Sequence, residues 1–231
     1  TLFESGYTPV PDDDRTPGEF LMGEFAFSDT IVLADPALVP VDPVARARGV
    51  QFIREVAPHA VVTESGCGVP SGRHRLVQAT ARTVPGFVQL PDRSSSPFRT
   101  VVQRFGRPLQ PERFGHALAA LAEGSCWVRG RLWIASAPDC RIAVQGIGPR
   151  IWLEDTGPWR VHRDPLPVLV HHGQDTLPET DAKSGDRETV LAVTGDGVDP
   201  AEIAALLAAC ELTDSELATG PGGIDDPFGL D

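Results

Sequence analysis

The sequence predicts an α/β unit followed by an α+β unit, the second built on an antiparallel sheet with helices on one face. Three observations lead to this fold class. Short apolar runs at 30–34 and 60–63 alternate with helical segments, which is typical of α/β winding. A stretch rich in Gly, Pro and Ser then interrupts the pattern. Beyond residue 98 the order of elements is β-α-β-β-β-β-α, which favours an antiparallel sheet.

The first unit, residues 1–66, is predicted to hold two helix–strand pairs. Residues 16–19 have the form of a capping box with proline at the first helical position, so a helix should run to about Phe27. The apolar runs TIVLA and AVVT should be buried parallel strands. Between them, Asp42-Pro43 starts a second helix. Its inner side should carry Val44, Phe52, Ile53 and Val56.

Residues 67–97 are predicted to form a linker that carries a short helix around 73–83. They contain closely spaced glycines and prolines and the run Ser94-Ser95-Ser96-Pro97, which disfavour long regular elements. The second unit therefore covers residues 98–231.

The second unit should begin with a strand at 98–105 and a helix that Pro111 opens and Gly124 closes. The inner side of that helix should carry Phe114, Ala117, Leu118 and Leu121. The next strand, residues 127–135, alternates as a half-buried strand does. One face holds Val128, Leu132 and Ile134, and the other holds Arg129, Arg131 and Trp133.

The remaining elements follow from turn and capping signals. Residues 141–145 and 150–154 are predicted to form a hairpin around Gly146 and Gly148, and 189–194 is a further strand. Asp199-Pro200 should cap a helix whose apolar stripe has helical spacing. That stripe consists of Ile203, Leu206, Leu207 and Cys210. A second capping box, Thr213 with Glu216, should start a last helix that ends at Gly220.

The net charge of -12 is distributed unevenly along the chain. The segments 1–72, 73–163 and 164–231 carry charges of -7, +8 and -13. The overall acidity argues against duplex DNA as a ligand, since duplex binding depends on neutralising phosphates. The arginine-rich middle segment either faces the acidic tail of its own chain or forms a patch for RNA or an acidic partner. A patch would require Arg99, Arg104, Arg129 and Arg131 to cluster on one exposed face.

No set of residues for catalysis is visible. Lys183 is the only lysine, and the glycine positions that a P-loop needs around it hold Leu177 and Ala182. The sequence contains no nucleophile elbow, no dinucleotide fingerprint and no H-E-x-x-H motif. The chain is therefore expected to act by binding rather than by chemistry of its own.

The metal-ligating residue types show no strong pattern. The four cysteines are scattered without zinc-knuckle spacing, which fits buried thiols in a reducing compartment. The pairs His171-His172 and Cys67 with His74 are interpreted as ordinary loop residues in preference to metal ligands. No apolar run approaches the length of a membrane span and no signal peptide is visible, so a cytoplasmic location is expected.

Five motifs of the second unit recur in a familiar order. They are 107–109 with 111–114, then 129–135, 185–187, 210–214 with Glu216, and 226–228. Together they resemble the C-terminal domain of CobW-family proteins, metal-handling GTPase relatives linked to zinc homeostasis and cobalamin synthesis. Residues 16–64 are similar to the last part of that family's GTPase domain. The resemblance implies an α/β tail of a P-loop-type domain followed by a CobW C-terminal domain.

The resemblance also implies that the P-loop, the magnesium-binding residues and the cysteine motif of the family lie upstream of Thr1. GTP, Mg²⁺ and Zn²⁺ are thus implied by the family only, and no catalytic, cofactor-binding or metal-ligating residue is expected in this chain. In family members, the strand that corresponds to residues 30–33 of this chain ends in an Asn-Lys-x-Asp motif that recognises guanine. The matching residues are Ala34, Asp35, Pro36 and Ala37, so guanine recognition should be lost.

The motif residues are candidates for binding a protein partner. This set comprises Arg107, Arg113, Arg129, Trp133, Gly185, Asp186, Arg187, Thr213, Asp214 and Phe228. Several have a structural alternative. Arg187 could pin its own loop through an ion pair, Thr213 could cap a helix, and Phe228 could anchor the C-terminus. Trp133 could equally be a core or a contact residue.

The leading hypothesis is the C-terminal part of a CobW-like zinc-homeostasis protein, a pseudo-GTPase that acts as a partner-binding or regulatory factor. Its partner would be a client metalloprotein or a ribosome-associated factor. It is most similar to actinobacterial-type members with degenerate nucleotide motifs, some of them connected with ribosome hibernation under zinc limitation. One alternative is part of an active GTP-hydrolysing metallochaperone. Another is an RNA- or ribosome-contacting module that uses an arginine-rich face.

Overall fold

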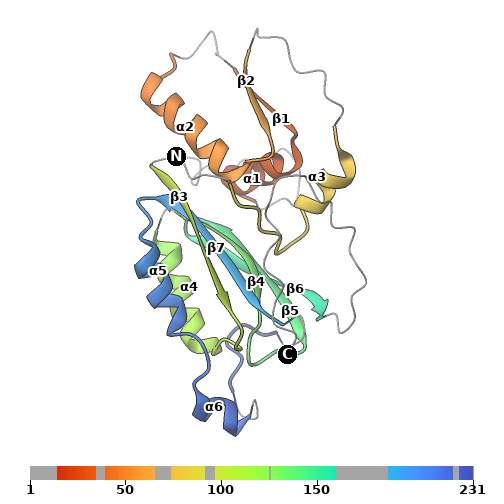
Figure 1. The fold of residues 1–231 in the computed structure, drawn as a ribbon, viewed down its shortest axis with the longest axis vertical. Helices are drawn as coiled ribbons and strands as arrows, with labels where there is room; N and C mark the ends of the chain where they lie inside the picture. The colour runs from red at the N-terminus through yellow and green to blue at the C-terminus, as the bar shows by residue number, and fades with distance from the viewer. Residues whose placement is uncertain are drawn as a thin grey trace.

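A computed structural model describes residues 15–34, 40–65, 74–91, 97–124, 126–159, 187–220 and 224–230. It contains a two-stranded sheet near the N-terminal end and a five-stranded sheet that forms the body of the molecule (Figure 1). The strand order of the larger sheet is β3-β7-β4-β5-β6. The division into an α/β part and an α+β part is confirmed.

The first unit has the predicted order of elements. Helix α1 (Pro17–Phe27) leads to strand β1 (Thr30–Leu33), and helix α2 (Pro43–Val56) leads to strand β2 (Val61–Glu64). The two strands are parallel, with Thr30 opposite Val61. The capping box of α1 is present, since the Thr16 hydroxyl accepts from the backbone of Glu19 and the Glu19 carboxylate accepts from that of Thr16.

The predicted burial of this unit is only partly right. Val44 is 68% exposed although its spacing predicted an inward position, because α2 packs through its C-terminal half around Val56. Val32 of β1 and Val61 of β2 are also exposed. Within the described residues β1 and β2 pair only with each other, so the apolar surface of a parallel sheet is left open.

Part of the predicted linker is packed structure. Helix α3 (Leu76–Arg82) lies where a short helix was expected. The following segment, 84–91, crosses the larger sheet. Gly86 has a φ of 81°, and a Cβ atom at this position would lie 3.1 Å from the carbonyl oxygen of Gly130. Only a glycine combines this turn with so close an approach.

The second unit has the predicted order, β3-α4-β4-β5-β6-β7-α5, followed by the short helix α6. The bounds are β3 (Phe98–Phe105), α4 (Pro111–Glu123), β4 (Trp127–Leu132), β5 (Cys140–Ile147), β6 (Arg150–Pro158), β7 (Thr189–Asp196), α5 (Pro200–Ala208) and α6 (Asp214–Thr219). Every pairing in this sheet is antiparallel, as expected. The chain turns between β5 and β6 at Gly148, whereas Gly146 lies within β5 opposite Ile151.

The main core lies between one face of the sheet and the helices α4 and α5 (Figure 1). The predicted inward residues of α4 are all buried, and Val128, Leu132 and Ile134 are completely buried under them. Of the predicted stripe on and after α5, Ile203, Leu207 and Cys210 are buried, and Leu206 is partly buried beside them.

The first unit packs against one end of the larger sheet. Met22 and Val56 form a second apolar cluster, and Trp127 and Ile147 of the sheet complete it. The rings of Phe52 and Phe98 meet edge to face, with their centroids 5.2 Å apart. The two units are therefore joined by an apolar interface as well as by the chain.

Candidate functional site

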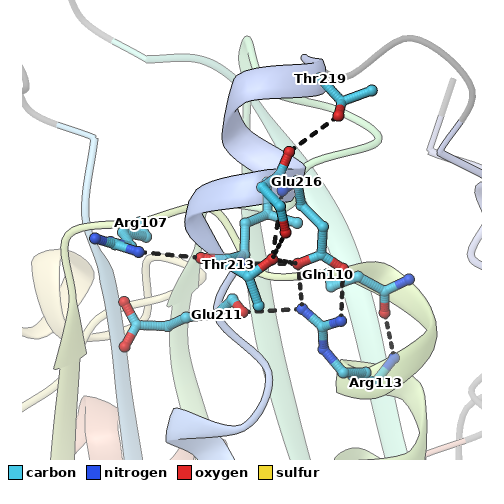
Figure 2. A network of polar contacts seen from close by, with 9 residues as sticks. Arg107, Gln110, Arg113, Glu211, Thr213, Glu216 and Thr219 are labelled. Carbon is cyan, nitrogen blue, oxygen red and sulfur yellow. Dashed lines mark hydrogen bonds and ion pairs between the residues drawn. The ribbon is translucent and has the colours of Figure 1, made fainter.

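Four of the predicted site residues meet at the base of α6. Arg107 and Arg113 come from the start of the α4 region, and Thr213 and Asp214 from the start of α6, about a hundred positions later in the chain (Figure 2). The contacts that join them run from α4 to α6. We call this group of ion pairs and hydrogen bonds the α4–α6 network.

Arg113 is the centre of the α4–α6 network. Its two terminal nitrogens donate to the two carboxylate oxygens of Glu216 over 2.7 and 2.9 Å, and one of them also donates to the carbonyl of Glu211 over 2.9 Å (Figure 2). The hydrogen bonds to Glu216 raise the pKa of Arg113. In return, the bonds from Arg113 and the donors of Thr213 lower the pKa of Glu216 to about 2. Such a two-pronged ion pair fixes orientation as well as distance.

The other members of the network hold the same two elements together. The Arg107 guanidinium lies 2.8 Å from a carboxylate oxygen of Asp214. Thr213 forms the predicted capping box, since its hydroxyl accepts from the backbone amide of Glu216 and its own backbone amide donates to the Glu216 carboxylate. The capping role expected of Thr213 is thus confirmed, and the contacts of Arg107 and Asp214 are within the chain.

Phe228 anchors the C-terminal segment, which was the structural alternative to a role in partner binding. Its ring meets that of Phe114 at a centroid distance of 6.4 Å, beside Gly115 of α4. Asp226 fixes the turn before it, because its carboxylate accepts from the backbone amides of Phe228 and Leu230 and from the hydroxyl of Ser136. The C-terminal segment 224–230 is thereby tied to the core.

Arg129 lies in the interior, where the first unit meets the sheet. It is 4% exposed, donates to the Thr194 hydroxyl over 2.8 Å and to the Gln89 carbonyl over 3.2 Å, and lies 3.7 Å from the centre of the Trp127 ring. Burial lowers the pKa of Arg129 to about 9, and the charge of Glu55, a fully buried residue of α2, opposes that effect. Arg129 therefore joins the units and is not presented to a partner in this conformation.

The expected exposed face of arginines is not formed, so that form of the RNA hypothesis is wrong. Arg129 is buried, and Arg104 and Arg131 both pair with Glu188, at 3.0 and 3.1 Å. Only Arg99 of the four is exposed. The physical reason is that acidic residues of the C-terminal segment neutralise the arginine-rich segment, which was the alternative interpretation of the charge pattern.

The remaining predicted residues are spread over the molecule. Arg187 donates to the exposed carboxylate of Asp139 over 2.9 Å, whereas Gly185 and Asp186 lie outside the described residues. Trp133 is half-buried, and its backbone amide donates to the Thr189 hydroxyl. These residues do not join the α4–α6 network.

Ala34 is the first of the residues that replace the family's guanine-recognition motif. It follows β1 directly and is exposed. Asp35 and Ala37 lie outside the described residues. The same holds for His171, His172 and Cys67 among the metal candidates. His74 is described and lies 3.0 Å from a carboxylate oxygen of Asp29.

Within the part of the chain that the structure describes, no three His, Cys, Asp or Glu side chains are grouped as a metal site would need. Among the same residues, no helix is both long enough and apolar enough to cross a membrane.

The site residues that the sequence did not single out are acidic. Glu216 was expected only as a capping partner of Thr213, and Glu188 and Glu55 were not noted at all. Glu216 is 103 positions from Arg113 in the chain, so no local sequence pattern could predict that the two residues pair. The only available signal was the charge distribution, which placed arginines and acids in different segments.

Residues 98–211 match the family described as the cobalamin synthesis protein cobW C-terminal domain. The match begins at the first residue of β3 and includes the sheet, α4 and α5. These residues belong to the CobW C-terminal domain family. In this CobW C-terminal domain, Arg107 and Arg113 lie inside the matched range, whereas their partners Asp214 and Glu216 lie just beyond it.

The CobW assignment is accompanied by longer relatives. The Mycobacterium tuberculosis protein named zinc chaperone Rv0106 and an uncharacterized protein of Mycobacterium bovis are each 28% identical over 230 residues. The alignment covers 94% of this chain and 55% of each relative, so the chain spans about half the length of the curated relatives it matches. Among solved structures, Zn(II)-bound YjiA GTPase from E. coli matches 83% of this chain and 54% of its own, with 13% identity and a TM-score of 0.46.

The α4–α6 network makes a pH-dependent prediction for the CobW C-terminal domain. The pKa of Glu216 is lowered from 4.5 to about 2 in the folded chain, so its contribution to stability is complete above pH 4.5 and is lost as the pH falls toward 2. Replacing Arg113 by methionine should raise the pKa of Glu216 toward 4.5, and the value should stay below 4.5 because the donors of Thr213 remain. The Glu216 carboxyl resonance, followed by NMR titration, measures both values.

A matched control separates this pair from a general effect of charge. Arg187→Met removes a positive charge elsewhere in the domain and should leave the titration of Glu216 unchanged. An equal change in both variants would mean that Glu216 responds to net charge and not to the ion pair with Arg113.

Proposed function

We propose that this chain is the partner-binding part of a CobW-like zinc-handling protein whose nucleotide-binding half does not select guanine. The observation that carries the proposal is Ala34. It occupies the exposed position directly after β1, where the family resemblance expects the asparagine that reads the base. A methyl group offers guanine no hydrogen bond, and each lost bond of this kind costs about 1–3 kcal/mol of recognition.

The sequence next to Ala34 supports the same conclusion. Asp35 stands where the family has a lysine and so replaces a cation with an anion, and Ala37 replaces the base-reading aspartate with a methyl group. The exposed apolar residues of β1 and β2 fit a sheet that continues into a larger nucleotide-binding unit. Zinc handling is supported by the relative named a zinc chaperone, and regulation of a client metalloprotein or of a ribosome-associated factor is the role we favour.

The proposal is tested by nucleotide selectivity in the longest natural form of the protein. A fluorescent GTP analogue is bound in the presence of Mg²⁺ and displaced by GTP or by ATP. We expect either no binding or displacement constants for the two nucleotides that agree within about threefold, because no side chain at 34, 35 or 37 distinguishes the bases. A preference for GTP of about a hundredfold would overturn the proposal and favour an active GTP-hydrolysing metallochaperone.

A gain-of-function variant makes the same test sharper. The triple substitution Ala34→Asn, Asp35→Lys and Ala37→Asp restores the family's residue types. If the upstream half still holds phosphates, GTP should then displace the analogue at least about tenfold better than ATP does. Asp35→Lys alone changes the charge without adding a hydrogen bond to the edge of the base, so it should raise affinity for both nucleotides equally.

A further inference from the structure

A groove of about 600 Å³ lies beside the α4–α6 network. The start of α4, helix α6 and the C-terminal segment form its walls, and α6 projects from the body of the molecule at this point (Figure 1). The volume is in the range of sites that hold a small ligand or a short stretch of peptide. The proposed nucleotide-binding unit is at the other end of the molecule, so the groove is separate from it.

The walls of the groove are held in place by contacts with the rest of the domain. The ion pairs from Arg113 to Glu216 and from Arg107 to Asp214 fix α6 (Figure 2). The packing of Phe228 against Phe114 fixes the C-terminal segment. A groove whose walls are already ordered loses less conformational entropy when a partner binds.

The lining of the groove combines apolar surface with negative charge. Leu212, Ile224 and Pro227 supply apolar surface. Glu112 of α4 and Asp225 of the C-terminal segment are exposed, and no lysine, arginine or histidine lines the groove among the residues that the structure describes. The third lining carboxylate, Glu216, is already paired with Arg113.

We infer that this groove binds a short basic segment of a protein partner, with lysine or arginine side chains set beside an apolar residue. Cationic side chains would meet Glu112 and Asp225, and the apolar residue would meet Ile224 and Pro227. Complementary charge of this kind selects a partner and speeds its association. A nucleic acid or an acidic segment would be repelled. The inference deepens the proposed function, because it names the surface and the chemistry of the partner.

The test begins with selection of random peptides displayed on phage against the full 231-residue chain. We expect the enriched peptides to contain lysine or arginine around an apolar residue. A fluorescent copy of the most enriched peptide is then titrated with the chain, and its anisotropy is measured at fixed ionic strength. Enrichment of acidic peptides, or of none, would overturn the inference.

Two charge-matched double variants locate the binding. Glu112→Lys with Asp225→Lys inverts the groove, and Glu123→Lys with Glu202→Lys makes the same change of charge at exposed positions outside its lining. The groove variant should bind the peptide at least about tenfold more weakly, and the control variant within about twofold of the original chain. An equal loss of peptide affinity in both variants would show that only long-range attraction acts, and it would overturn the inference that the peptide binds in the groove. Thermal unfolding of each variant verifies that it folds.

These outcomes are distinct from those of the nucleotide test. Guanine selectivity would overturn the proposed pseudo-GTPase and leave the peptide titration unaffected. Equal losses in the two charge variants would remove the groove and leave the nucleotide result standing.

Discussion

Replacement of Gly130 by alanine is expected to cost about 3 kcal/mol or more of folding free energy, because the added methyl group has no space. A Cβ atom at Gly130 would lie 2.0 Å from the carbonyl oxygen of Val190 and 2.9 Å from the Cα of Leu191. Both atoms belong to the backbone of β7, which pairs with β4 in the middle of the sheet. Only a shift of one central strand could relieve the clash, so the helix-covered core on that sheet would be disrupted as well.

The measurement is equilibrium unfolding in urea, compared with that of Gly49→Ala. Gly49 lies within α2 and has no atom within 4 Å of an added Cβ. Alanine there should stabilise the chain by about 0.5–1 kcal/mol through its higher helix propensity. A Gly130→Ala variant as stable as the original chain would mean that β4 and β7 are farther apart than this structure places them.

Arg129→Met is expected to be similarly damaging, at about 3–5 kcal/mol. Methionine keeps much of the apolar stem but removes the charge. The carboxylate of Glu55, fully buried in α2, would then lose the favourable field of a buried cation. Thr194 and the carbonyl of Gln89 would each lose a donor, and the Trp127 ring would lose the cation that lies on it.

The pair is best measured as a double-mutant cycle. Arg129→Met combined with Glu55→Leu removes both buried charges, and the double variant should be more stable than Arg129→Met alone. Arg99→Met is the control, because Arg99 is exposed and should contribute within about 0.5 kcal/mol. Unfolding free energies that simply add would show that Arg129 and Glu55 do not interact across the two units.

Most of the secondary structure could be predicted from local patterns. The capping boxes at Thr16 and Thr213, the prolines at helix starts and the alternation along β4 each depend on residues within a few positions of one another. The burial of α4 followed from its spacing for the same reason. The incorrect predictions concern burial, which depends on the neighbours that cover a helix or strand. Val44 is exposed although Arg46 and Arg48 of the same half of α2 pair with Glu64 and Asp196, and spacing alone carries no information about neighbours.

The site could be predicted only in part. Four of the predicted site residues meet at the base of α6, whereas the binding of a partner by these residues stays a prediction. Their roles were harder to predict, since the partners of Arg113 and Arg107 lie far away in the sequence. Arg129 is the clearest case of a residue whose role could not be predicted from the sequence. Alternation placed it on the face opposite Val128, and only the packing of α2 and of residues 84–91 against that face made it a buried residue.

By itself, the sequence determined the order of the elements, the antiparallel sheet and the absence of a P-loop around Lys183, and through the family resemblance it predicts the loss of guanine-reading groups at Ala34 and Ala37. These depend on residue identity and short-range spacing. Only the tertiary structure decided that Arg104 and Arg131 of the middle segment pair with Glu188, that Arg129 joins the two units, and that an acidic groove remains beside α6. Each of these depends on which distant side chains meet, and folding brings them together through the burial of apolar surface, which does not follow order along the chain.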